Sequence, residues 1–136
     1  MEKDLVIGFI TGYHFDKLKP WIHSLNESGF DGDKILFCYG ISDETIEEIH
    51  KHGISTIQHP RYDSESFNIV VHRFYHLWSI LSSMKTEYEN VLTTDVADVI
   101  FQLSPSYVMN RILSSYDIMA SSEGLKYKDE IGRAHV

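Results

Sequence analysis

Short apolar runs alternate with amphipathic helical segments in the first half of the chain, and this alternation constrains the fold more than any other feature. Residues 4–10 (DLVIGFI) are predicted to be a buried strand, and residues 34–40 (KILFCYG) and 54–58 (ISTIQ) are predicted to be the second and third strands. Between them, residues 15–29 and 42–53 have helical spacing, and each of these segments ends at a glycine. A strand–helix–strand–helix–strand order predicts a parallel sheet with right-handed crossovers.

Local end signals support both of these helices. Leu18, Ile22 and Leu25 share one helical face, and Gly29 follows as a stop signal. Ser42 is predicted to be the N-cap of the second helix, because acidic residues fill the turn that follows it.

The segment 67–84 is apolar on most sides, with Val70, Phe74, Leu77 and Trp78 at helical spacing. We therefore expect a helix buried deeply against the sheet, with Phe74 and Trp78 in the core rather than stacked on a sugar.

The remaining segments complete the expected fold. Residues 90–94 (NVLTT) are predicted to be the fourth strand, 105–113 a short helix and 116–122 a fifth strand. The predicted class is α/β, Rossmann-like, with a mainly parallel sheet and flanking helices.

Size and charge restrict the class of partner. A chain of 136 residues that is 43% hydrophobic can form one small domain with its own core. The balance of 12 Lys+Arg against 20 Asp+Glu gives a net charge of −8, which disfavours nucleic acid as a partner. The single cysteine, Cys38, lies in an apolar run and is predicted to be a core residue.

The first residues, MEKDLVIGFITGY, have an acidic start and too short an apolar run for a signal peptide or a membrane span. We therefore expect a cytoplasmic protein, while a Golgi location of a parent that has lost its membrane anchor stays open.

Asp95 and Asp98 stand three residues apart at the end of the predicted fourth strand, in NVLTTDVADVIFQLSP. Ligands of open α/β sheets bind at the carboxyl ends of strands, and the same segment contains no Lys or Arg to neutralise these carboxylates. A Mg²⁺ or Mn²⁺ ion that shares its other ligand positions with substrate phosphates would neutralise them. The alternative is structural: Asp95 ends the strand and Asp98 caps or turns the loop.

The block VLTTDVADVIFQLSP resembles the TDVRDVxFQ type of segment in nucleotide-sugar glycosyltransferases with the GT-A fold, where a DxD-like motif ends a central strand. LVIGFITGY, LKPWIHSL, VHRF and SSEGLKYKDE follow the order of that family. The spacing here is DxxD, and Ala97 stands where an arginine is frequent. The resemblance covers nearly the whole chain, but only the N-terminal half of such a domain, so we expect a truncated GT-A domain.

The resemblance implies transfer of a sugar from a nucleotide-diphospho-sugar donor to an acceptor hydroxyl on a glycan, lipid or protein. Asp95 and Asp98 would hold the metal, with one of them near the ribose. The other implied donor-binding residues are Thr11 and Tyr13 at the nucleoside, Arg73 at the base, ribose or phosphates, and Glu123 near the sugar. Thr11 and Tyr13 fit an ordinary loop equally well, and Arg73 fits a surface ion pair.

Two rival functions stay open. A nucleotidyl- or phosphotransferase would use the same metal, although the sequence has no Gly-x-x-x-x-Gly-Lys-[Ser/Thr] loop. A noncatalytic binding domain would use the aspartates structurally.

His72 and His76 have a spacing that can hold zinc, but a third ligand, His14 or His59, would have to be brought in by folding.

The last residues continue no structural pattern. EIGRAHV can be encoded by GAG-ATC-GGA-AGA-GCA-CAC-GTC, which contains the start of a common sequencing-library adapter. We therefore expect residues 1–130 to be the N-terminal part of the GT-A domain and residues 131–136 to be a non-native, adapter-derived tail.

Overall fold

The computed structural model describes residues 3–60 and 69–120. Within these residues, strands and helices alternate along the chain. The elements are β1 (Lys3–Thr11), α1 (Phe15–Glu27), β2 (Asp33–Tyr39), α2 (Asp43–Lys51), β3 (Ser55–His59), α3 (Ile69–Ser83), β4 (Tyr88–Thr94) and α4 (Pro105–Ile112).

The four strands of the described residues form one parallel sheet in the order β3-β2-β1-β4. β1 lies in the interior, and its Ile7 stands in register with Ile35 of β2 and Thr93 of β4. The α/β class and the parallel sheet are therefore confirmed, and the strand order is compatible with a Rossmann-like fold.

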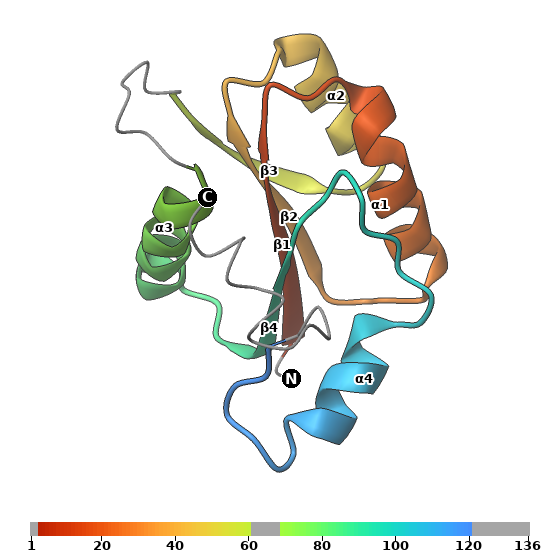
Figure 1. Cartoon of the computed structure of the whole chain (residues 1–136), viewed down its shortest axis with the longest axis vertical. Coiled ribbons are helices and arrows are strands. Elements are labelled where there is room, and N and C mark those ends of the chain that lie inside the picture. The colour runs from red at the N-terminus through yellow and green to blue at the C-terminus, as the bar shows by residue number, and fades with distance from the viewer. Residues whose placement is uncertain (1–2, 61–68, 121–136) are drawn as a thin grey trace, which may run out of the picture.

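Helices cover both faces of the sheet, with α1 and α2 on one side and α3 on the other (Figure 1). Successive side chains of β1 point to opposite faces of the sheet. Val6 and Ile10 pack toward α1 and α2. Leu5, Ile7 and Phe9 pack on the other face, toward α3. A parallel sheet covered on both faces needs apolar residues at consecutive positions, which is the pattern that β1 and β2 show.

Several local predictions are confirmed. The Ser42 hydroxyl accepts a hydrogen bond from the Thr45 backbone N–H at 3.3 Å, as an N-cap does. Gly29 and Gly53, which follow α1 and α2, adopt left-handed φ values of 81° and 77°. Cys38 is buried, and this burial raises the pKa of its thiol to about 12.

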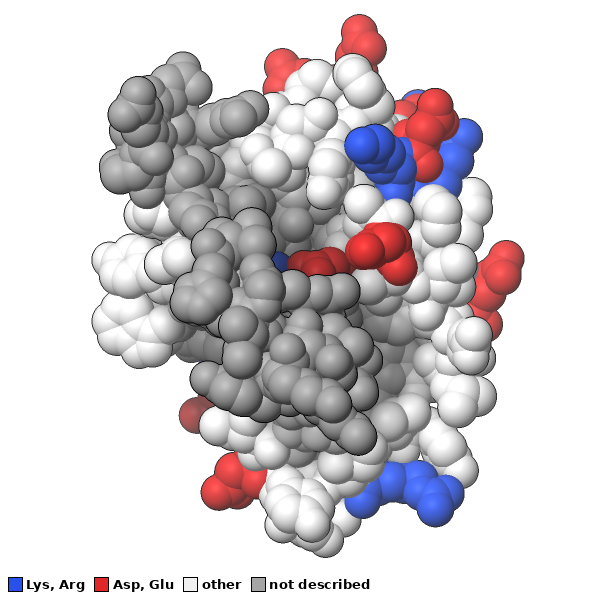
Figure 2. All heavy atoms as spheres, in the orientation of Figure 1, with Lys and Arg blue, Asp and Glu red and all other residues white. Residues whose placement is uncertain are grey.

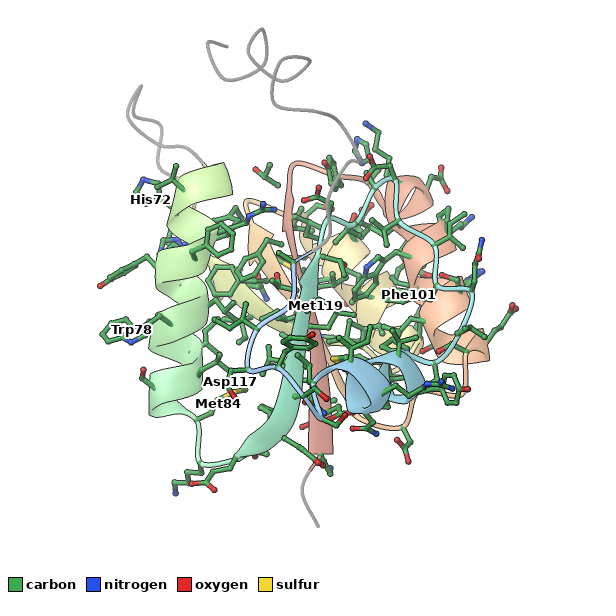
Figure 3. All side chains as sticks on the ribbon, turned by 60° about the horizontal axis from the view of Figure 1, so that its bottom comes forward. His72, Trp78, Met84, Phe101, Asp117 and Met119 are labelled. Carbon is green, nitrogen blue, oxygen red and sulfur yellow. The ribbon has the colours of Figure 1, made fainter. Side chains whose placement is uncertain are left out.

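The expectation that residues 67–84 would be deeply buried is wrong for the outer face of α3. Leu77, Ile80, Leu81 and Met84 pack against the sheet. Four large side chains of the helix are more than half exposed, namely Val71, Phe74, Tyr75 and Trp78. Trp78 points away from the sheet in Figure 3. A helix packed on one face of a sheet buries only the stripe of side chains that faces the sheet, and these four side chains lie outside that stripe.

The predicted fifth strand at 116–122 is wrong over residues 116–120, which form no strand. Tyr116 and Ile118 are 65% and 85% exposed, so the apolar residues of this segment have no sheet face to pack on. Residues 121–136, including Glu123 and the predicted tail 131–136, lie outside the described residues.

None of the described helices combines the length and apolar character that crossing a membrane requires. On the face shown in Figure 2, basic and acidic side chains are dispersed, and no broad basic patch is visible among the described residues.

Candidate functional site

The carboxyl ends of β1 and β4 form the point at which the strand order reverses. From β1 the chain proceeds through β2 to β3, and α3 then returns it to β4 on the other side of β1 (Figure 1). The loops that leave the two neighbouring strands at such a point run in opposite directions, which opens a crevice beyond the carboxyl ends of the strands.

A pocket of about 400 Å³ occupies this position. Its described lining comes from the end of β1, from α3 and from the loop after β4, and consists of Phe9, Thr11, Tyr13, Arg73, Asp95, Val96, Ala97 and Asp98. The structure therefore brings together every site residue expected from the sequence except Glu123, which is not among the described residues.

Thr11 and Tyr13 border the pocket on the β1 side. They flank Gly12, whose φ of 61° turns the chain sharply at the end of the strand. The hydroxyl oxygen of Thr11 is buried and has no hydrogen-bond partner among the described residues. A buried hydroxyl without a partner is costly, so this atom is a candidate contact for a ligand.

Arg73 reaches the same pocket from the first half of α3. Its Nη1 donates a hydrogen bond to Oδ1 of Asp95 at 2.8 Å, and its guanidinium carbon lies 5.1 Å from the ring centre of Phe74. The Nε–H group is buried without a partner in the described part of the chain. Arg73 therefore does form an ion pair, but with a pocket residue that lies 22 positions away rather than along its own helix.

Asp95 and Asp98 stand at the beginning and the end of a short turn that follows β4. Between them, Val96 is 3% exposed and packs in the core that faces α1, and the Val99 N–H donates to the Val96 carbonyl at 3.4 Å. Gly8 of β1 accommodates Val96, because a Cβ on Gly8 would overlap the valine side chain. This buried valine fixes the turn and leaves both carboxylates exposed at the pocket.

The loop that contains the aspartates is held by α1 at both ends. The indole N–H of Trp21 donates to the Thr94 hydroxyl at 3.0 Å, and the Ser24 hydroxyl accepts from the Phe101 N–H at 2.9 Å. The Phe101 ring also contacts Trp21 edge-on, at 5.6 Å between ring centres. These contacts give the loop a fixed path between residues 94 and 101.

Arg73, which lies outside the segment of the two aspartates, neutralises part of their negative charge. Asp98 has no ion pair or hydrogen bond within the described residues. Sequence reasoning identified Arg73 and Asp95 separately but missed their pairing. It also missed Val96, whose apolar character between two acidic residues was the available signal.

The carboxylate pair fits a hard divalent cation only if a ligand completes the coordination. In residues 3–60 and 69–120 no group of three or more His, Cys, Asp or Glu side chains converges as a metal site. Mg²⁺ is commonly held by one or two carboxylates together with substrate phosphates and water, and two carboxylates on one pocket meet that requirement.

The His72–His76 pair has no such convergence with a third ligand among the described residues. Nδ1 of His76 is hydrogen-bonded to the Tyr39 hydroxyl, and its ring stacks on Phe37 with centres 5.2 Å apart. The ring centres of His59 and His76 lie 4.5 Å apart. His59 and His76 therefore belong to one aromatic cluster with Phe37 and Tyr39. His14 begins α1 as its N-cap residue, and its side chain makes no cap hydrogen bond.

Comparison of this chain with models of protein families, with curated proteins and with solved structures found no match.

Proposed function

We propose that this chain is the donor-binding part of a metal-dependent glycosyltransferase with the GT-A fold. It would bind a nucleotide-diphospho-sugar and support transfer of the sugar to an acceptor hydroxyl. The observation that carries the proposal is the convergence of Thr11, Tyr13, Arg73, Asp95 and Asp98 on one pocket at the β1–β4 strand ends.

The polar groups of the pocket suit the parts of such a donor. Thr11 and Tyr13 border the β1 side, where a nucleoside would lie, and the buried Thr11 hydroxyl has an unused hydrogen-bonding capacity. Arg73 supplies N–H donors suited to phosphate oxygens, since guanidinium–phosphate hydrogen bonds are charge-assisted.

Asp95 and Asp98 would hold Mn²⁺ or Mg²⁺ through their exposed carboxylates. When bound, the divalent ion supplies charge neutralisation for the departing nucleoside diphosphate. The acceptor oxygen forms a bond to the anomeric carbon while the bond from that carbon to the diphosphate oxygen breaks. The acceptor proton passes to a base that we do not assign to any described residue.

The Arg73–Asp95 ion pair favours a second candidate, a noncatalytic binding domain in which Asp95 is structural. In that case Arg73 already neutralises Asp95, and no metal is required. The two candidates differ in whether ligand binding depends on a divalent ion.

Calorimetric titration of UDP, GDP and CMP into the full chain tests the proposal, first with Mn²⁺ and then with excess chelator. We expect saturable binding of one nucleotide that disappears with chelator. Circular dichroism on the same sample verifies that it is folded. Binding that persists unchanged in chelator would favour the noncatalytic candidate, and a folded sample that binds no nucleotide would overturn the donor-site assignment.

A further inference from the structure

The two partners of the Arg73–Asp95 ion pair differ in exposure. The Arg73 side chain is 25% exposed, whereas the Asp95 side chain is 68% exposed. The described contact between them is a single hydrogen bond, from Nη1 to Oδ1. Because the carboxylate is already well solvated, it can leave the arginine at a low cost in desolvation.

The guanidinium of Arg73 keeps one hydrogen-bond donor without an acceptor among the described residues when Arg73 is paired with Asp95. Its Nε–H is buried without a partner in the described part of the chain, and it belongs to the same pocket as the unpartnered Thr11 hydroxyl. A buried donor without an acceptor raises the free energy of the ligand-free site. A ligand oxygen placed in the pocket would satisfy this donor.

The same ion pair opposes binding of a metal alone. With Arg73, Asp95 and Asp98 in one pocket, the charged side chains carry a net negative charge that attracts a cation. However, Arg73 already occupies one oxygen of Asp95, so a divalent ion must compete with a resident cation for that carboxylate.

We infer that Asp95 exchanges partners when the donor binds. In the ligand-free protein Arg73 is its counter-ion. When a divalent ion and a nucleoside diphosphate enter together, Asp95 turns to the ion and the guanidinium turns to a phosphate oxygen. This inference rests on the proposed function, and it makes Arg73 a ligand-binding residue that also couples metal binding to nucleotide binding.

The exchange predicts that the substitution Arg73→Gln raises the affinity for Mn²⁺ alone and lowers the affinity for the nucleoside diphosphate. Arg73→Gln removes the competitor, so Mn²⁺ alone should bind about two- to five-fold more tightly, as expected for loss of a partly exposed ion pair. The same variant should bind the nucleoside diphosphate in the presence of Mn²⁺ at least about ten-fold more weakly, since a charge-assisted hydrogen bond is lost. A purely structural role would weaken both.

The experiment measures free Mn²⁺ by its paramagnetic resonance signal during titration of the full chain, and then repeats the titration with UDP or GDP. Arg111→Gln is the matched control. Arg111 lies on α4, outside the pocket, and donates from Nη1 to the Tyr107 hydroxyl at 2.8 Å. This control should change neither affinity.

A double variant separates the competition for Asp95 from any effect of the Arg73 substitution on folding. In an Asp95→Asn background the contested carboxylate is gone, so adding Arg73→Gln should tighten Mn²⁺ binding less than it does in the wild-type protein. An unchanged Mn²⁺ affinity in the single Arg73→Gln variant would overturn the exchange. Weaker Mn²⁺ binding in the single Arg73→Gln variant, at unchanged thermal stability, would also overturn the exchange.

Failure of the proposed function has a different signature. A folded wild-type chain that binds neither UDP nor GDP with Mn²⁺ would overturn the donor site and the nucleotide half of the exchange. The competition between Arg73 and Mn²⁺ for Asp95 would still be decided by the titration with metal alone.

Discussion

Trp21 on α1 donates its indole N–H to the hydroxyl of Thr94, the last residue of β4, although the two residues are 73 positions apart. The indole is fully buried, so this N–H has no access to water. The bond fixes the end of the strand from which the aspartate loop departs. It therefore links the core beneath the sheet to the geometry of the pocket.

Thr94→Val should lower the free energy of unfolding by about 1–3 kcal/mol, because it leaves the buried indole N–H without an acceptor at nearly constant side-chain volume. Urea unfolding measures the loss. Thr93→Val is the matched control, since Thr93 is exposed on the same strand. Equal stability of the two variants would show that the Trp21 bond contributes nothing.

Gly8→Ala should lower the free energy of unfolding by about 1–3 kcal/mol, because the added methyl group overlaps Val96 and overpacks the site. Displacement of Val96 should also weaken any metal-dependent nucleotide binding, since Asp95 and Asp98 flank this residue. Combining Gly8→Ala with Val96→Ala should recover part of the lost stability. A double variant as unstable as the sum of its parts would contradict this packing relationship.

Asp98→Asn and Asp95→Asn should each abolish Mn²⁺-dependent nucleotide binding, a loss of at least about 100-fold, while leaving the melting temperature nearly unchanged. Both carboxylates are exposed, so neither substitution disturbs the core. Asp31→Asn provides the control, because Asp31 lines a separate pocket at the other end of the strands, where β1 and β4 begin. Retained affinity in both variants, with unchanged stability, would refute the metal assignment.

Stability should fall as the pH drops below about 6.5 because of His76. Partial burial, together with His59 and His72, lowers the pKa of His76 below its ordinary value of 6.5. Between the lowered value and 6.5 the unfolded chain binds more protons than the folded chain, so the free energy of unfolding rises with pH. The neutral ring can accept a hydrogen bond at Nδ1 from the Tyr39 hydroxyl, whose pKa is raised to about 12 by burial.

Urea midpoints measured from pH 7 to pH 5 test this dependence. His76→Gln keeps an acceptor for Tyr39 but cannot be protonated, so its midpoint should fall less steeply with pH than that of the wild-type protein. His14→Gln, at the start of α1, should keep the wild-type slope. Parallel curves for His76→Gln and the wild-type protein would exclude His76 as the source.

The first half of the fold was predictable because its signals are local. Ser42, Gly29 and Gly53 mark helix ends through their own backbone and cap chemistry, and β1 and β2 contain buried apolar runs. The exposure of Trp78 was not predictable, since periodicity shows which residues are apolar but not which element covers them. The carboxylate pair was visible, whereas the Arg73–Asp95 bond depends on how α3 crosses the sheet.

Cys38 gives the protein an internal reporter of its own opening. As the single cysteine of the sequence, it lies on β2 with 1% exposure, and its pKa of about 12 keeps it a thiol at neutral pH. The thiolate is the form that attacks an alkylating reagent, so labelling requires the sheet to separate from α1 and α2. The rate of Cys38 labelling therefore measures native-state opening without any engineered probe.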